Sequence, residues 1–290
     1  MFLSFVDNFV QLLYPYIRSK GEQNVGIGGR RTAGFYRGQQ KKVLGGLKAS
    51  KRPTFTLVLG AQGVGKSSLT ALFENAAVIS PDAYVADYYA AVGIDPRDNP
   101  YDREIGDFAM RVTQEILTEA VRRKYDIVYD AMSMSDAGRL VGGVKSLGYG
   151  VALKAVVNDM YASALNVEER KLRYDEDYTE YARGKGAYPQ GNPLEVDSGD
   201  SIVRSMEMMD FLEKADKKGV KIEVYRTGEK EPAFVTGQGG DFAAFAETVA
   251  VGDKSGNMER CCKLVRKAMN AGKEDAVMRL KRLERELNGR

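Results

Sequence analysis

The sequence predicts an α/β fold in which helices cover both faces of a mostly parallel central sheet of about five strands. Short apolar runs alternate along the chain with amphipathic, helix-forming segments, which is the order that parallel sheets require. The apolar runs are continuous, as expected for strands that are buried on both faces. The chain has 290 residues, of which 43% are hydrophobic. This is enough for one large domain with extensions.

The expected strands and helices follow one another in a regular order. Strands are expected at 54–60, 76–80, 125–131, 150–157 and 221–227. Helices are expected at 66–74, 83–92, 103–124, 136–147, 159–176 and 200–218. Connections between parallel strands are almost always right-handed, which leaves few ways of winding this order into a sheet.

The expected core carries an extension at each end. We predict three parts, with boundaries at 1–52, 53–236 and 237–290. In the first part, apolar residues recur at helical spacing before Pro15 and predict an N-terminal helix. The rest of that part, residues 20–52, is rich in Gly, Lys and Arg and predicts a partly ordered basic connector.

The last part predicts a helical extension. Residues 237–256 are turn-rich and begin it. Two amphipathic segments follow at about 257–270 and 273–288, on either side of a short polar turn. This pattern predicts a helical hairpin that either packs on the core or is solvated.

The composition excludes several kinds of chemistry. The chain has no histidine, so any proton transfer falls to Asp, Glu, Lys or Tyr. The two cysteines, Cys261 and Cys262, are adjacent and cannot form a disulfide framework, which fits a reducing cytoplasm. The formal net charge of +3 is too small to indicate a nucleic acid or a membrane surface by itself. No apolar run is long enough to span a bilayer.

The most specific motif is a phosphate-binding loop between the first strand and the first helix. Residues 60–67 match G-x-x-x-x-G-K-[ST] at every fixed position. Glycines let successive backbone N–H groups turn toward phosphate oxygens, and the following helix presents its positive N-terminus. Lys66 is expected at the β- and γ-phosphates and the Ser67 hydroxyl on Mg²⁺. The expected nucleotide-binding residues are Gly60, Ala61, Gln62, Gly63, Val64, Gly65, Lys66, Ser67 and Ser68.

This motif predicts the P-loop NTPase fold, and two missing motifs indicate the class. Motor and AAA-type ATPases end an apolar strand in Asp-Glu, where the Glu activates water. Here Asp130 is followed by Ala131. A GTPase would carry N-K-x-D, which the sequence lacks. Both observations favour a kinase, whose acceptor is a substrate hydroxyl.

Two carboxylates follow strands of the expected sheet. A P-loop kinase needs a carboxylate that orients the acceptor hydroxyl and accepts its proton. Asp82 follows the second strand at the sheet edge where ligands bind. It is either this base or a helix cap, a role open also to Ser80. Asp130 ends the third strand and is expected to bind substrate, to hold Mg²⁺ through water, or to make a structural hydrogen bond.

The charged segment at 166–186 supplies basic side chains after the fourth strand. These are Arg170, Lys171, Arg173, Arg183 and Lys185. Arginines stabilise the oxygens that gain charge during phosphoryl transfer. The other interpretation of this segment is a solvated, salt-bridged helix face.

The ordered set of motifs resembles the zeta-toxin family of P-loop kinases over about residues 54–228. The loop GAQGVGKSSL, the segment VISPDAYVADYY at 78–89 and the segment at 125–157 are similar to those of the family. The resemblance implies catalytic roles for Asp82 as base and for Lys66. It implies that Asp130 contacts the substrate and that Arg170 and Arg183 bind phosphate.

The resemblance also implies an activity and partners. These are ATP- and Mg²⁺-dependent phosphorylation of a sugar hydroxyl on a UDP-N-acetylhexosamine or on NAD, and an antitoxin or inhibitor protein that obstructs the nucleotide site. The acidic strand end is Asp130 where the family commonly has Glu, and Met132 follows it. We expect a cytoplasmic protein, in a bacterium or in the cytosol of a host cell, with neither a nucleic-acid partner nor a membrane span.

Two other functions remain open from the sequence. A polynucleotide 5′-kinase would use the same chemistry on a nucleic-acid end, and the basic residues between 18 and 52 are its support. A non-catalytic nucleotide-sensing protein would bind partners through the terminal helices. Salt-sensitive nucleic-acid binding would indicate the first, and nucleotide binding without turnover the second.

Overall fold

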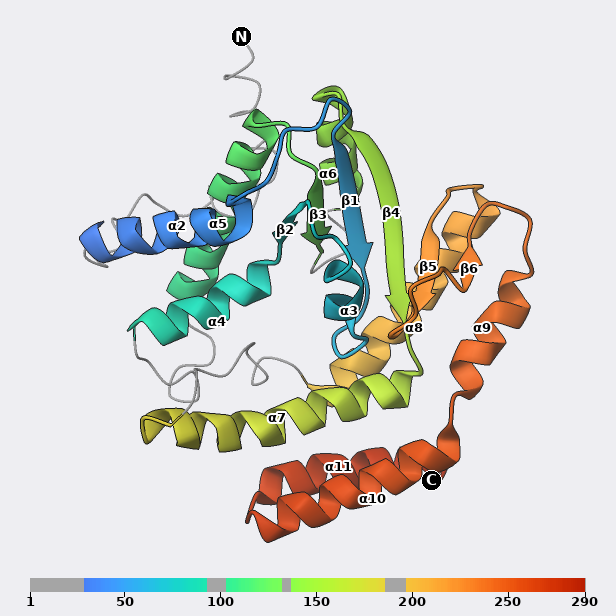
Figure 1. The fold of residues 1–290 in the computed structure, drawn as a ribbon. Coiled ribbons are helices and arrows are strands. Elements are labelled where there is room, and N and C mark those ends of the chain that lie inside the picture. Colours follow the sequence, from blue (N-terminus) through green and yellow to red (C-terminus); the bar gives the residue numbers. More distant parts are fainter. Residues whose placement is uncertain (1–28, 93–102, 132–136, 186–196, 290) are drawn as a thin grey trace. The chain divides into compact units, whose positions relative to one another are not determined.

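The structure is a computed structural model that describes residues 29–92, 103–131, 137–185 and 197–289. Over these residues it confirms the predicted α/β class with a mostly parallel sheet (Figure 1). The strand order is β2-β3-β1-β4-β5-β6. The strands are β1 Thr54–Leu59, β2 Ala77–Ile79, β3 Ile127–Asp130, β4 Gly150–Val157, β5 Glu223–Arg226 and β6 Phe234–Val235. The predicted N-terminal helix lies outside the described residues.

Contacts divide the chain into two compact units, which we describe separately. Unit 1 comprises residues 1–59 and 70–153, and unit 2 comprises residues 60–69 and 154–290. The helices of unit 1 are α2 Gly29–Leu44, α4 Pro81–Val92, α5 Arg103–Arg122 and α6 Ala137–Ser146. Those of unit 2 are α3 Lys66–Thr70, which begins in the phosphate loop, α7 Met160–Ala182, α8 Ser198–Lys217, α9 Phe242–Val251, α10 Lys254–Asn270 and α11 Glu274–Leu287.

In unit 1, β3 lies between β1 and β2 and is parallel to both. Phe55 and Ala77 both align with Ile127 in these pairings. All of β1 after its first residue is buried. Because the three strands run the same way, their carboxyl ends meet at one edge of the sheet, where parallel α/β sheets bind ligands.

Helix α2 was not expected, because residues 20–52 were predicted to form a partly ordered connector. The Phe35 ring lies 5.1 Å from that of Phe108 on α5 and 6.4 Å from that of Tyr88 on α4. Gln39 is buried and donates a hydrogen bond of 2.8 Å to Asp87. Packing through Phe35 and Gln39 therefore holds one face of α2 in place. The Gly- and Lys-rich composition of the segment gave no sign of this helix.

Unit 2 also contains two elements that were not expected. Strand β6 pairs antiparallel with β5, so the sheet has six strands among the described residues rather than about five. Helix α9 lies in the segment predicted as turn-rich. The side chain of Asp241 caps it by accepting from the Ala244 N–H. The ring of Phe234 on β6 stacks 5.0 Å from that of Phe245 on α9.

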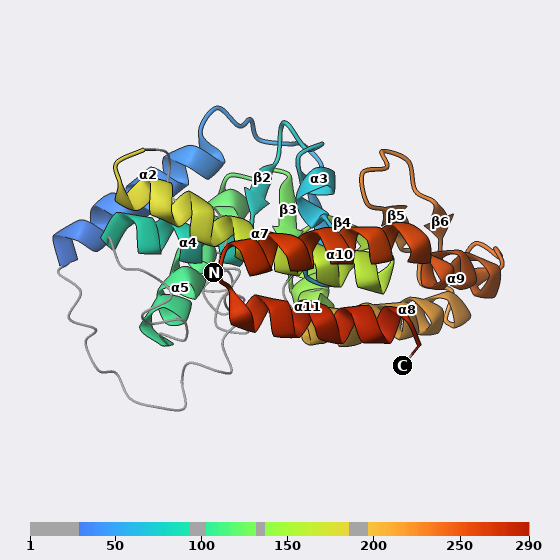
Figure 2. The ribbon, with the colours of Figure 1, turned by 90° about the horizontal axis from the view of Figure 1, so that it is seen from below.

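The predicted C-terminal hairpin is present as α10 and α11, which lie side by side in Figures 1 and 2. Both helices pack against α7. The apolar cluster that joins the three helices contains Ala164, Leu165, Leu172, Cys261, Leu264, Val265, Ala268, Ala276, Leu280, Leu283 and Leu287. Burial raises the pKa of the Cys261 thiol to about 12. This thiol is therefore protonated and unreactive at neutral pH.

Candidate active site

The phosphate loop of unit 2 has the backbone conformation that its glycines permit. Gly63 and Gly65 have φ values of +83° and +84°, in the left-handed region that residues with a Cβ rarely adopt. A Cβ on Gly63 would lie 2.3 Å from the Ser163 carbonyl oxygen, and one on Gly65 would lie 2.8 Å from Thr227 Cγ2. The loop therefore lies directly against α7 and against the end of β5, and a larger residue would displace it.

Three side chains hold consecutive carbonyl groups of this loop. The bonds are Ser201 Oγ to Gln62 O at 2.6 Å, Asn166 Nδ2 to Gly63 O at 2.6 Å and Thr227 Oγ1 to Val64 O at 2.5 Å. In a planar trans peptide, the C=O group and the following N–H group point in opposite directions. The N–H groups of residues 63–65 therefore face away from these three donors. This is the arrangement that a phosphate-binding loop requires.

Lys66 and Ser67 begin helix α3 at the end of the loop. The Lys66 ammonium donates a hydrogen bond of 3.0 Å back to the Gly60 carbonyl, so its side chain crosses the loop. The Ser67 side chain is exposed in the first helical turn. The N–H groups of the loop and the Lys66 ammonium fit the phosphates of a nucleotide. The Ser67 hydroxyl fits one ligand position of Mg²⁺.

The other ligands of such a Mg²⁺ ion would be phosphate oxygens and water. Within the described ranges, no group of three or more His, Cys, Asp or Glu side chains could hold a metal ion. Mg²⁺ is commonly bound by one or two protein oxygens together with substrate phosphates, so it does not require such a group.

The two predicted carboxylates both lie in unit 1, after neighbouring strands. Asp130 is the last residue of β3 and aligns with Val58 of β1, two positions before the loop begins in the sequence. The Ser80 hydroxyl, which follows β2, donates to Asp130 Oδ2 at 3.4 Å. Asp82 is half-buried in the first turn of α4. A carboxylate in a first turn is stabilised by the helix dipole, which gives Asp82 a structural role in α4.

The two predicted arginines are both exposed in unit 2, and the structure does not bring them together. Arg170 lies within α7 and Arg183 immediately follows that helix. Thirteen residues separate them, which corresponds to roughly 20 Å along a helix. Arg170 is one turn after Asn166, so it shares the face of α7 that contacts the phosphate loop.

Sequence reasoning missed the three side chains that hold the loop carbonyls. Asn166, Ser201 and Thr227 are 103, 139 and 163 positions away from their acceptors. They are ordinary polar residues with no spacing motif relative to the loop. Only the packing of α7, α8 and the end of β5 shows what they do.

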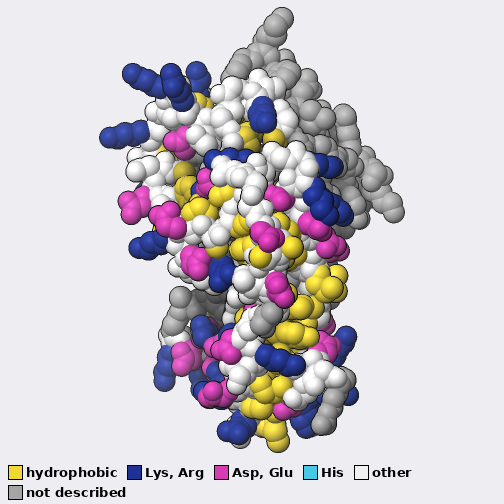
Figure 3. All heavy atoms as spheres, turned by 90° about the vertical axis from the view of Figure 1, so that its right-hand side faces the viewer, with side chains coloured by type: hydrophobic (Ala, Val, Ile, Leu, Met, Phe, Trp, Pro, Cys, Tyr) yellow, Lys and Arg dark blue, Asp and Glu magenta, His cyan; other side chains and the backbone are white. Residues whose placement is uncertain are grey.

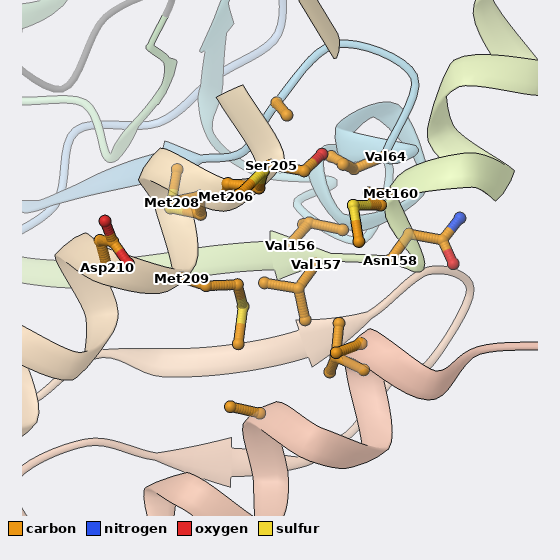
Figure 4. Close-up of a pocket in the computed structure, with 14 residues that line it drawn as sticks. Val64, Val156, Val157, Asn158, Met160, Ser205, Met206, Met208, Met209 and Asp210 are labelled. Atoms are coloured by element: carbon orange, nitrogen blue, oxygen red, sulfur yellow. The ribbon is translucent and has the colours of Figure 1, made fainter. Parts of the chain in front are cut away.

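An apolar pocket of about 280 Å³ also lies in unit 2 beside the loop (Figure 4). Ala61 and Val64 of the loop form part of its wall, and Met160, Met206 and Met209 form another part. Ser205 lines it as well, one turn after Ser201 in α8. The loop is therefore held by polar contacts through its carbonyls and borders an apolar pocket through Ala61 and Val64.

On the face drawn in Figure 3, Lys and Arg side chains gather at the upper end, and lower down they are interspersed with Asp and Glu. Among the helices that the structure describes, none is long and apolar enough to cross a membrane.

The phosphate loop on a parallel α/β sheet defines the class of P-loop nucleotide-binding proteins. The family model for Zeta toxin matches residues 40–184, which is half of the chain. The chain therefore belongs to the zeta toxin family, which consists of kinases, and it is a phosphotransferase.

A solved structure shows the same fold. A structure from the PezAT chromosomal toxin–antitoxin system of Streptococcus pneumoniae matches with a TM-score of 0.60 and 17% identity, over 82% of this chain and 97% of that one. Two AvrRxo1-ORF1:AvrRxo1-ORF2 structures match with TM-scores of 0.45. The structure with sulphate ions is 11% identical and covers 99% of this chain and 88% of its own. The structure with ATP is 12% identical and covers 97% of this chain and 84% of its own. No curated protein matches the chain in sequence.

Proposed function

We propose that this chain is an ATP- and Mg²⁺-dependent kinase that phosphorylates a sugar hydroxyl of a nucleotide-like metabolite, either a UDP-N-acetylhexosamine or NAD. The observation that carries the proposal is the phosphate loop, in which a side chain holds each of three consecutive carbonyls, so that the N–H group of each following residue faces away from that side chain. Membership of a kinase family supports it. The choice between the two acceptors rests on the resemblance alone.

The loop and its helix bind the triphosphate in this proposal. Its N–H groups bind phosphate oxygens, and the Lys66 ammonium exchanges the Gly60 carbonyl for oxygens of the β- and γ-phosphates. The Ser67 hydroxyl would hold Mg²⁺, and Asp130 would do so through water. Bound there, Mg²⁺ would neutralise negative charge on the phosphates.

The carboxylates act on the acceptor. Asp130 binds the substrate, and Asp82 orients its hydroxyl and accepts the proton as the oxygen attacks the γ-phosphorus. The bond from the γ-phosphorus to the oxygen of the leaving ADP breaks, and the phosphoryl group passes to the acceptor. Arg170 and Arg183 stabilise the charge on the transferring group.

Replacing the base tests this assignment. We expect Asp82→Asn to lower kcat by about 10²- to 10⁴-fold while ATP affinity stays within about twofold, because only proton transfer is lost. Steady-state kinetics and calorimetric titration of ATP measure the two effects. Asp275→Asn, which removes an exposed carboxylate from the first turn of α11, controls for loss of a helix-terminal charge. Unchanged turnover in Asp82→Asn would remove Asp82 from the mechanism.

We also propose that the kinase acts in the cytoplasm of a bacterium, or in the cytosol of a host cell, and that an antitoxin or inhibitor protein restrains it. The family and the fold shared with a toxin–antitoxin structure support this. Expression of the chain alone is expected to slow bacterial growth, and Lys66→Ala is expected to abolish the effect. Equal growth inhibition by the wild-type chain and by Lys66→Ala would contradict a toxic kinase activity.

A further inference from the structure

The C-terminal hairpin is fastened to α7 by buried polar contacts as well as by the apolar cluster. Glu168 of α7 is fully buried, and Arg279 Nε of α11 lies 3.0 Å from both of its carboxylate oxygens. Asp159, which caps the start of α7, accepts a hydrogen bond of 2.9 Å from Asn257 of α10. Because charges and amides are buried only when they have partners, these contacts fix how the hairpin lies on α7.

One contact continues beyond α7 to the phosphate loop. The Asn166 amide donates through Nδ2 to the Gly63 carbonyl at 2.6 Å. Its Oδ1 atom accepts from Arg260 Nη2 of α10 at 2.7 Å. The same guanidinium also bonds Glu169, which fixes it beside the amide. Figures 1 and 2 show α10 alongside α7, where this contact is made.

The chemistry of the three groups allows only one orientation of the amide. A guanidinium has donors and no acceptor, whereas a backbone carbonyl accepts only. Arg260 therefore requires the amide oxygen, and Gly63 O then receives the amide nitrogen. Without Arg260, the amide oxygen loses this donor, and only the bond to the Gly63 carbonyl still holds the Asn166 side chain in place.

We propose that Arg260 is a positioning residue for the phosphate loop: it orients Asn166, which holds the Gly63 carbonyl and so directs the Val64 N–H toward the nucleotide. The C-terminal hairpin thereby becomes part of the nucleotide-binding apparatus without contacting the nucleotide. This inference rests on the proposed nucleotide-binding role of the loop.

The test compares ATP affinity and loop exchange in full-length variants. Arg260→Met keeps the aliphatic stem and removes the donors. We expect it to weaken Mg²⁺-ATP binding about fivefold, the effect of one hydrogen bond, and to speed amide hydrogen exchange across residues 61–66 without nucleotide. Arg260→Lys, which retains a donor, should lose less ATP affinity than Arg260→Met and should show slower amide exchange in the loop. Lys263→Met removes an exposed ion pair from the same helix and should change neither.

A double-mutant cycle distinguishes an effect of Arg260 that passes through Asn166 from a general loosening of the hairpin. In an Asn166→Ala background, Arg260→Met is expected to cause no further loss of ATP affinity, because its only route to the loop is already gone. Additive losses would overturn the proposal, as would unchanged affinity and exchange in Arg260→Met. A wild-type protein that binds no ATP would instead overturn the proposed function and this inference together.

Discussion

At the scale of single residues, the phosphate loop depends on groups that never reach the phosphate. The glycines supply the backbone conformation, and Ser201, Asn166 and Thr227 donate hydrogen bonds to the loop's carbonyls. Each tether comes from a different segment of unit 2. The loop is therefore organised before a nucleotide arrives, which lowers the entropic cost of binding.

Replacing Thr227 with an isosteric apolar residue tests this preorganisation. Thr227→Val keeps the methyl group against Gly65 but removes the hydroxyl that donates to Val64 O. We expect ATP binding to weaken about fivefold, since one hydrogen bond contributes about 1 kcal/mol. Calorimetric titration measures the change. Thr113→Val serves as the control, because that hydroxyl donates within α5, to the Ala109 carbonyl. Equal affinities for Thr227→Val and the wild type would show that the loop needs no such tether.

At the scale of elements, α7 connects most of the residues of unit 2 to which we assign a role by proposal. It carries Arg170 and Asn166, and Arg183 follows its last turn. The apolar cluster and the Glu168–Arg279 contact attach the hairpin to it. A helix that carries phosphate-binding groups is held more precisely when a second layer packs on it.

The hairpin's contribution to stability is measurable at Leu280, which is fully buried in the cluster. Leu280→Ala is expected to lower the free energy of unfolding by about 2–5 kcal/mol, because it leaves a cavity between α7, α10 and α11. Urea denaturation measures this loss. Met278→Ala in the same helix is the matched control, since that side chain is 64% exposed and should cost under about 0.5 kcal/mol. Equal effects of the two substitutions would mean that the hairpin does not pack as described.

At the scale of the whole molecule, the sequence predicted what local patterns encode. Continuous apolar runs revealed the strands, and the loop motif with its flanking strand and helix revealed the nucleotide-binding class. Helices α2 and α9 were missed because ring contacts with other elements, Phe35 with Phe108 on α5 and Phe245 with Phe234 on β6, stabilise them in Gly-rich surroundings. The partners of Gln62, Gly63 and Val64 were missed because tertiary packing alone brings them to the loop.

The most direct test of the account is phosphoryl transfer itself. The wild-type protein and Lys66→Ala would each be incubated with Mg²⁺-ATP and UDP-N-acetylglucosamine, NAD, nucleosides, aminoglycosides or a 5′-hydroxyl oligonucleotide. Mass spectrometry would detect the gain of one phosphate. The account predicts a singly phosphorylated UDP-sugar or NAD with the wild type and none with Lys66→Ala. Phosphorylation of the oligonucleotide alone, or ATP binding with no product from any acceptor, would contradict it.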